Sequence, residues 1–154
     1  MVERFENIDA VLNFAIANEI DANQFYRKLA TKMDVPAMRQ VFLDFAKEEA
    51  GHQAKLEAVQ QGDLSFGAGA AAKVQNLGLA DYLVAAPPKA DMTYAEALIL
   101  AMKKEKAAYQ LYMDLATVAE AEELTEMFLG LAAEEARHKL RFEIEYDDVV
   151  LKED

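Results

Sequence analysis

The chain contains no cysteine, which excludes disulfides, zinc–thiolate sites and iron–sulfur clusters. Basic residues are also scarce: 16 lysines and arginines stand against 28 aspartates and glutamates, which gives a net charge of −12. This charge argues against nucleic acid or an anionic membrane surface as a partner. No apolar run approaches the roughly 20 residues that a membrane span needs. The first residues lack the pattern of a signal peptide, so we expect a cytoplasmic protein.

Histidine is scarce too, and both copies stand in the same motif. Glu49-Ala50-Gly51-His52 and Glu135-Ala136-Arg137-His138 each place a Glu three residues before a His. Residues three apart on a helix project from one face, so each pair can bind one metal ion. Glu19 and Glu105 each stand 30 residues before one of these pairs. Two Glu-x-x-His pairs, plus one Glu from each of two other helices, form the ligand set of a dinuclear carboxylate centre in a four-helix bundle.

These positions belong to an internal repeat with an offset of 86 residues. Residues 8–58 align with residues 94–144 without a gap, and Tyr26 aligns with Tyr112. Two copies of such a long unit are too few for a solenoid. The repeat therefore predicts one helix hairpin used twice, with pseudo-twofold symmetry.

Apolar residues recur at steps of three and four, which predicts helices over about 7–33 and 35–61, a third from 93, and a fourth over 121–148. Short connections make each pair an antiparallel hairpin, and the crossover between the pairs is long enough to return along the bundle even if Ala70–Ala86 is partly helical. We expect one all-α domain over residues 1–154, composed of a hairpin at 7–61, a crossover at 62–92 and a hairpin at 93–148.

Several residues at the predicted helix ends suit those positions. Asn7 and Asp34 can cap the first and second helices, and Pro36 fits the first turn of the second. Thr93 with Glu96 three residues later predicts a capping box at the start of the third helix.

The six candidate ligands fall on the inward faces of the predicted helices, near the middle of the bundle. Ionised carboxylates are almost never buried without a partner, and these inward faces carry no Lys or Arg. Two divalent ions would balance the four glutamates, and two neutral histidines would add nitrogen ligands. Such mixed donors suit iron or manganese, and can also hold zinc or cobalt.

Other residues of the repeat carry weaker signals. Tyr26 and Tyr112 each stand seven residues after a candidate Glu. Each could be a core residue or could donate a hydrogen bond to a ligand. Glu48 and Glu134 adjoin the candidate ligands but are expected to point sideways as surface charges. Glu134→Ala should therefore spare metal binding, whereas Glu135→Ala should weaken it strongly.

Taken together, the motifs resemble those of the rubrerythrin branch of the ferritin-like superfamily. The residues that carry the resemblance are Glu19, Phe25-Tyr26 and Glu48-Glu49-Ala50-Gly51-His52, repeated as Glu105, Leu111-Tyr112 and Glu134-Glu135-Ala136-Arg137-His138. The resemblance implies a ferritin-like bundle with two iron ions, with Tyr26 and Tyr112 as supporting catalytic candidates. It implies that Glu49 and Glu135 bridge the ions. The remaining implied ligands are Glu19 and His52 for one ion, and Glu105 and His138 for the other.

Two features differ from rubrerythrins. Ala108 stands where they carry an additional Glu, and without cysteine there is no rubredoxin module, so an external electron donor is expected. The six candidate ligands are equally similar to the ferroxidase centre of bacterioferritins. Three functions stay open: an oxidoreductase acting on peroxide or O₂, a ferroxidase or iron storage or delivery protein, and a redox-silent metal-stabilised bundle. By analogy with ferritin-like bundles, we also expect a homo-oligomer such as a dimer.

Overall fold

Four long helices dominate the structure, a computed structural model that describes residues 7–62, 69–75, 77–78, 82, 84 and 93–152. They are α1 (Ile8–Thr31), α2 (Pro36–Gln60), α4 (Tyr94–Val118) and α5 (Glu122–Lys152), and the short helix α3 covers Ala70–Val74. The four predicted long helices are thus confirmed. Helix α5 continues beyond the predicted end at residue 148.

Asn7 and Thr93 cap the first residues of α1 and α4, as predicted. The Asn7 side chain accepts a hydrogen bond of 2.8 Å from the backbone N–H of Ala10. Thr93 and Glu96 form both hydrogen bonds of a capping box at the start of α4. A side-chain cap of this kind stabilises a helix by about 1 kcal/mol.

The predicted cap at Asp34 is wrong. The N-cap of α2 is Val35, and no side chain caps this helix. Pro36 explains the difference, because a proline at the first helical position forces the residue before it into an extended conformation. Val35 accordingly has φ −89° and ψ 117°, which leaves Asp34 one residue outside the capping position.

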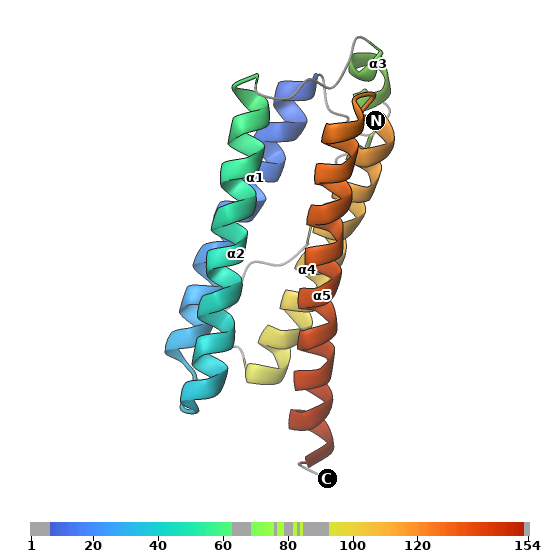
Figure 1. Ribbon diagram of the computed structural model, residues 1–154. Helices are drawn as coiled ribbons and strands as arrows, with labels where there is room; N and C mark the ends of the chain where they lie inside the picture. The colour runs from blue at the N-terminus through green and yellow to red at the C-terminus, as the bar shows by residue number, and fades with distance from the viewer. Residues whose placement is uncertain are drawn as a thin grey trace.

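The two antiparallel hairpins, α1 with α2 and α4 with α5, stand side by side (Figure 1). Helix α2 ends at the top of the bundle in this view and α4 begins at the bottom, so α2 and α4 run in the same direction. The chain between them therefore connects opposite ends of the bundle. Within Ala70–Ala86, the structure describes helix over Ala70–Val74. The rest of that range lies largely outside the described residues.

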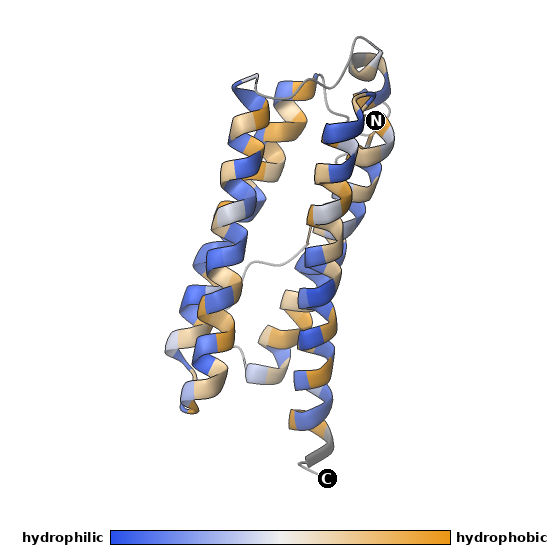
Figure 2. Ribbon diagram, in the orientation of Figure 1, coloured by the Kyte–Doolittle hydropathy of each residue, from blue (hydrophilic) through white to orange (hydrophobic). Residues whose placement is uncertain are grey.

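Two apolar clusters fill the interior, one towards each end of the bundle, and Figure 2 shows orange apolar positions along the helices that face it. One cluster includes Leu12, Leu56, Leu115 and Phe128, and the other includes Phe42, Leu98 and Phe142. Each such side chain stabilises the fold by about 1.5–3 kcal/mol when fully buried. The clusters thereby fix the layer of residues between them. None of the helices within the described residues is long and apolar enough to cross a membrane.

Candidate metal centre

Six polar side chains are buried in the layer between the two apolar clusters. They are Glu19 on α1, Glu49 and His52 on α2, Glu105 on α4, and Glu135 and His138 on α5. Each is at most 2% exposed. The structure therefore brings together all six candidate ligands that the sequence motifs predict. Four carboxylates and two imidazoles at this depth need a compensating charge, because desolvating each ionised group costs several kcal/mol.

The six side chains form two overlapping groups of potential ligands. The groups are Glu19, Glu49, His52 and Glu135, and Glu49, Glu105, Glu135 and His138. Within each group, one ligand atom from every residue lies within 4.8 Å of the others. Glu49 and Glu135 belong to both groups, and the repeat offset of 86 residues exchanges one group with the other. This arrangement can hold two neighbouring metal ions with two glutamates shared between them.

The donor atoms of this layer fit metal ions better than they fit one another. Each of the six residues has at least one buried nitrogen or oxygen without a hydrogen-bond partner among the described residues. His52 Nδ1 lies 2.7 Å from Glu135 Oε1, and His138 Nδ1 lies 3.0 Å from Glu49 Oε1. Neither nitrogen has a hydrogen-bond partner among the described residues. Buried polar atoms normally have hydrogen-bond partners, so unpartnered atoms from all six residues in one place indicate a site that can bind cations.

Each imidazole contacts a carboxylate of the opposite hairpin through Nε2, the ring nitrogen that faces away from the other candidate ligands. His52 Nε2 contacts Glu134 of α5, and His138 Nε2 contacts Glu48 of α2. An Nε2 that donates to a carboxylate leaves Nδ1 of the neutral ring as the lone-pair nitrogen, and Nδ1 is the atom that faces the other ligands. Arg137 also donates to Glu48, at 2.7 Å.

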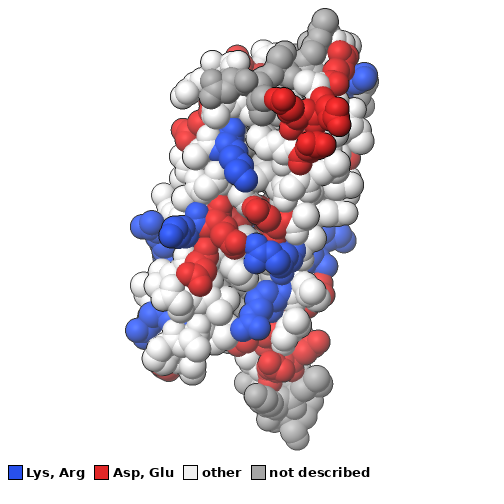
Figure 3. Space-filling model, in the orientation of Figure 1, with Lys and Arg blue, Asp and Glu red and all other residues white. Residues whose placement is uncertain are grey.

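The prediction that Glu48 and Glu134 are free surface charges is therefore wrong. Both side chains do point sideways and are 34% and 38% exposed, but that direction leads to the α2–α5 interface rather than to open water. One feature of the sequence could have indicated this role: two consecutive glutamates stand at equivalent positions in both repeats. Figure 3 shows acidic and basic side chains gathered together at this level of the α2–α5 face.

Truncation of Glu134 is now expected to weaken metal binding. In Glu134→Ala, His52 loses the carboxylate that fixes its ring orientation, and loss of such a partner typically costs 10–100-fold in metal affinity. Competition of the protein with a chelator for zinc would measure the change. Glu123→Ala, on an exposed position of α5, is the control and should not alter the affinity. Equal affinities for Glu134→Ala and the unaltered protein would show that this contact does not support the ligand.

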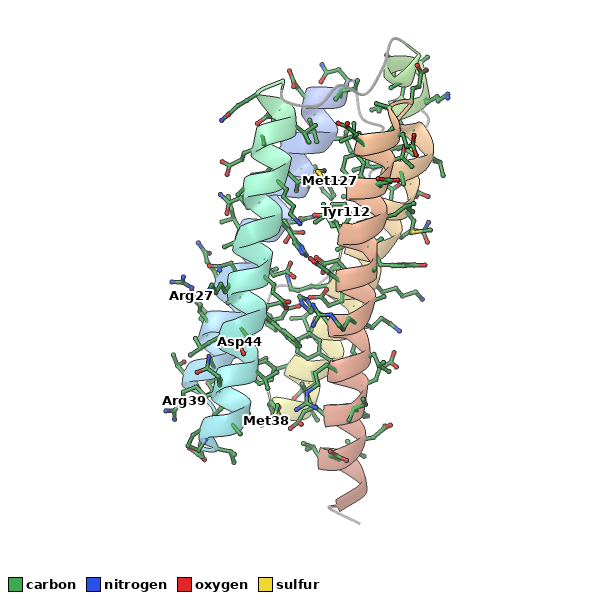
Figure 4. The ribbon with its side chains drawn as sticks, in the orientation of Figure 1. Arg27, Met38, Arg39, Asp44, Tyr112 and Met127 are labelled. Atoms are coloured by element: carbon green, nitrogen blue, oxygen red, sulfur yellow. The ribbon has the colours of Figure 1, made fainter. Side chains whose placement is uncertain are left out.

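Two tyrosines reach into the same layer, one from each apolar cluster. The Tyr26 hydroxyl of α1 donates to Glu105 of α4, and the Tyr112 hydroxyl of α4 donates to Glu19 of α1. Both tyrosines are at most 1% exposed, and Figure 4 shows Tyr112 inside the bundle whereas Arg27 and Arg39 point away from it. Burial and the charges of the neighbouring glutamates raise the pKa of both hydroxyls, which keeps them protonated as donors. Of the two predicted roles, the structure therefore shows the hydrogen bond to a candidate ligand.

The electrostatics of the metal-free layer oppose its full ionisation. Burial, reinforced by the charge of Glu105, raises the pKa of Glu49 and of Glu135 well above the usual value. Burial lowers the pKa of His52, but its close contact with Glu19 and the Glu19 charge outweigh burial and raise that pKa overall. Burial raises the pKa of Glu19, but its contacts with Glu49 and His52 give a net decrease. Without metal, bound protons therefore neutralise part of the negative charge that the cations would balance.

The bundle is similar to solved structures of other proteins. The chain is similar to a protein from Thermotoga maritima whose solved structure is described as ferritin-like and diiron-carboxylate, with a TM-score of 0.78 at 18% identity over 96% of this chain and 99% of that one. It is also similar to a hypothetical protein from Pyrococcus furiosus, with a TM-score of 0.69 at 25% identity over 89% of this chain and 86% of that one. No curated protein sequence matches it.

The likeness to the Thermotoga maritima structure shows that the bundle has the predicted ferritin-like fold. The sequence pattern of rubrerythrins matches this chain over residues 10–65 and 96–154, which include both hairpins and all six candidate ligands. The long crossover lies between the two matched segments. The chain belongs to the rubrerythrin family.

Proposed function

We propose that the protein is a di-iron oxidoreductase that reduces peroxide or O₂. The observation that carries this proposal is the set of buried, unpartnered donor atoms contributed by all six of the repeated Glu and His residues. Four carboxylates carry four negative charges, which two divalent ions neutralise while the histidines stay neutral. Oxygen-rich sites with a few imidazoles suit iron, and membership of the rubrerythrin family supports the same choice.

In this proposal, Glu49 and Glu135 would be shared by the two ions. Glu19 and His52 would hold one ion, and Glu105 and His138 would hold the other. Two ferrous ions held together supply two electrons at one place, which matches the two-electron reduction of peroxide. Manganese is the first substitute to consider, and zinc or cobalt would load the site without supporting the same chemistry.

The protein's own residues orient the candidate ligands. Tyr26 and Tyr112 each hold one oxygen of a terminal carboxylate, Glu105 or Glu19, while the other oxygen of that carboxylate has no hydrogen-bond partner among the described residues. The apolar clusters above and below the layer lower the local dielectric constant, which strengthens the electrostatic interactions within the layer. Reciprocal contacts across the hairpins hold both halves of the site in one geometry.

Stopped-flow oxidation of the ferrous protein tests the proposed reaction. We expect peroxide or O₂ to oxidise the protein-bound iron at least ten times faster than free ferrous iron under the same conditions, because the paired site delivers both electrons together. Protein loaded with zinc instead of iron is the control for absorbance changes unrelated to iron. Oxidation of the bound iron at the rate of free iron, with both oxidants, would contradict the proposal.

The number of irons retained per chain distinguishes the proposed oxidoreductase from a ferroxidase or storage protein. An oxidoreductase keeps two irons per chain after repeated cycles of ferrous iron and oxidant, whereas a storage protein accumulates many more. A redox-silent bundle would hold its metal without reacting. An external electron donor is needed for repeated turnover under our proposal. The predicted donor, the cytoplasmic location and the homo-oligomer stay predictions.

A further inference from the structure

A pocket of about 240 Å³ opens between α1 and α4 and reaches the four candidate glutamate ligands. The repeat relates its two walls, because Asn18 and Ala22 of α1 correspond to Lys104 and Ala108 of α4. Tyr82 and Val84 of the crossover add apolar surface to one side. The pocket therefore lies on the pseudo-twofold axis, directly beside the proposed metal pair.

The volume of this pocket exceeds what peroxide or O₂ needs. A water molecule takes up about 30 Å³ of the liquid, and either oxidant has only two heavy atoms. Ala22 and Ala108 each stand three residues after a candidate ligand, so they lie on the same helix face as Glu19 and Glu105. Their small side chains leave the space beside the ligands open. The pocket can thus admit an organic molecule of several heavy atoms.

Charge at the pocket differs between its two walls. Lys104 is partly buried and its ammonium lies 5.5 Å from the centre of the Phe25 ring, whereas the equivalent position on α1 is the neutral Asn18. Among the described residues, no carboxylate forms a salt bridge with Lys104, although Asp21 and Glu105 are close enough to act on its charge. Once two divalent ions balance the four glutamates, the charges that remain at the pocket are the Lys104 ammonium on the α4 wall and the Asp21 carboxylate on the α1 wall. The ammonium of Lys104 is the cationic group there that a carboxylate ligand can approach.

We propose that this pocket binds a small organic carboxylate, with its head at the metal pair and Lys104 and its apolar part against Ala22, Ala108, Tyr82 and Val84. The inference rests on the proposed metal centre, because without cations the four glutamates would repel an anion. A carboxylate has the two-oxygen head with which protein glutamates bind metal ions. A short alkyl chain matches the apolar lining on the crossover side.

Calorimetric titration of the zinc-loaded protein with butyrate tests the proposal without relying on activity. We expect saturable binding to the unaltered protein. Lys104→Met keeps the stem but removes the charge, and should weaken butyrate binding about tenfold, the usual worth of a hydrogen bond to a charged group. Ala108→Leu fills the pocket and should remove binding. Lys103→Met, at the exposed neighbouring position, is the matched control and should bind butyrate normally.

Zinc content per chain, measured on the same samples, distinguishes failure of the pocket proposal from failure of the metal centre. Two zinc ions per chain without saturable butyrate binding would overturn the pocket proposal and leave the metal centre standing. Equal butyrate affinity in Lys104→Met and the unaltered protein would also overturn it. Failure of the unaltered protein to take up zinc would overturn the metal centre and this proposal together. If Ala108→Leu does not fold, the Lys104→Met comparison still decides.

Discussion

Replacement of Glu135 by glutamine is expected to abolish binding of the metal pair while leaving the metal-free protein at least as stable as before. Glu135 belongs to both ligand groups, is fully buried, and has two oxygens without a hydrogen-bond partner among the described residues. The amide keeps the shape of the side chain but removes the charge that two cations would share. We expect the stoichiometry to fall from two ions to at most one. Affinity should fall by more than the roughly 100-fold that loss of a supporting residue can cost.

The metal-free part of this prediction has a separate physical reason. Burial and the neighbouring Glu105 and Glu49 charges raise the pKa of Glu135, which shows that the ionised carboxylate is unfavourable there. A neutral amide avoids that cost, so thermal unfolding of the metal-free variant should occur at the same or a higher temperature. Glu143→Gln, at a partly exposed position of α5, is the control. Unchanged stoichiometry in Glu135→Gln would contradict the shared-ligand assignment.

Metal loading is expected to reverse the pH dependence of stability. In the metal-free protein, Glu49 and Glu135 have pKa values raised above the usual 4.5 by burial first and by neighbouring glutamates second. A group with a raised folded-state pKa contributes stability that is fully present below its unfolded pKa and is lost as pH rises through the folded value. The raised pKa of His52 acts in the same direction. The lowered pKa of Glu19 acts oppositely, but only below 4.5. Metal-free protein should therefore lose stability between pH 5 and about pH 8.

The metal-loaded protein should behave in the opposite way, because metal ions bind the deprotonated ligands and compete better with protons as pH rises. At a free metal concentration of about 1,000 times Kd, each site adds about 4 kcal/mol of stability. For a chain of this size, two such sites correspond to a rise on the order of 20 °C in Tm. Thermal unfolding at pH 5 to about pH 8, with chelator or with ferrous iron under anaerobic conditions, measures both slopes. Parallel curves for the two forms would contradict the proposed coupling between metal and protons.

The packing of the helices gives this coupling a structural basis. Close backbone approaches are extensive within each hairpin and few between the hairpins, which meet mainly through side chains of the two apolar clusters and of the layer between them. Several of the contacts that do cross between hairpins belong to the candidate centre, including the pairs Tyr26 with Glu105 and His52 with Glu134. Ions shared by Glu49 and Glu135 would join α2 to α5 directly. We therefore expect metal removal to loosen the association of the hairpins more than the helices themselves.

The six candidate ligands could be predicted from sequence because the repeat fixes their register. An offset of 86 residues places Glu19, Glu49 and His52 on the same faces as their counterparts in the second hairpin. Helical periodicity then predicts that those faces point inward, whatever the angle at which the helices pack. The same periodicity predicts the helices themselves.

The roles of Glu48 and Asp34 could not be predicted from periodicity, because they depend on how the helices pack and how their ends are built. Glu48 points sideways as expected, but only the packing of the hairpins shows that His138 of α5 lies there. Asp34 suits an N-cap by residue type, but Pro36 at the first helical position holds Val35 in an extended conformation and makes Val35 the N-cap. The pocket between α1 and α4 depends on helix separation, which periodicity does not specify.

Anomalous diffraction at the iron edge, from crystals soaked anaerobically with ferrous salt, would test the central claim most directly. The account predicts two peaks in each chain, both within bonding distance of Glu49 and Glu135, one also near Glu19 and His52 and the other near Glu105 and His138. Absence of iron from this buried layer, with the six side chains satisfied by protein or water instead, would contradict it.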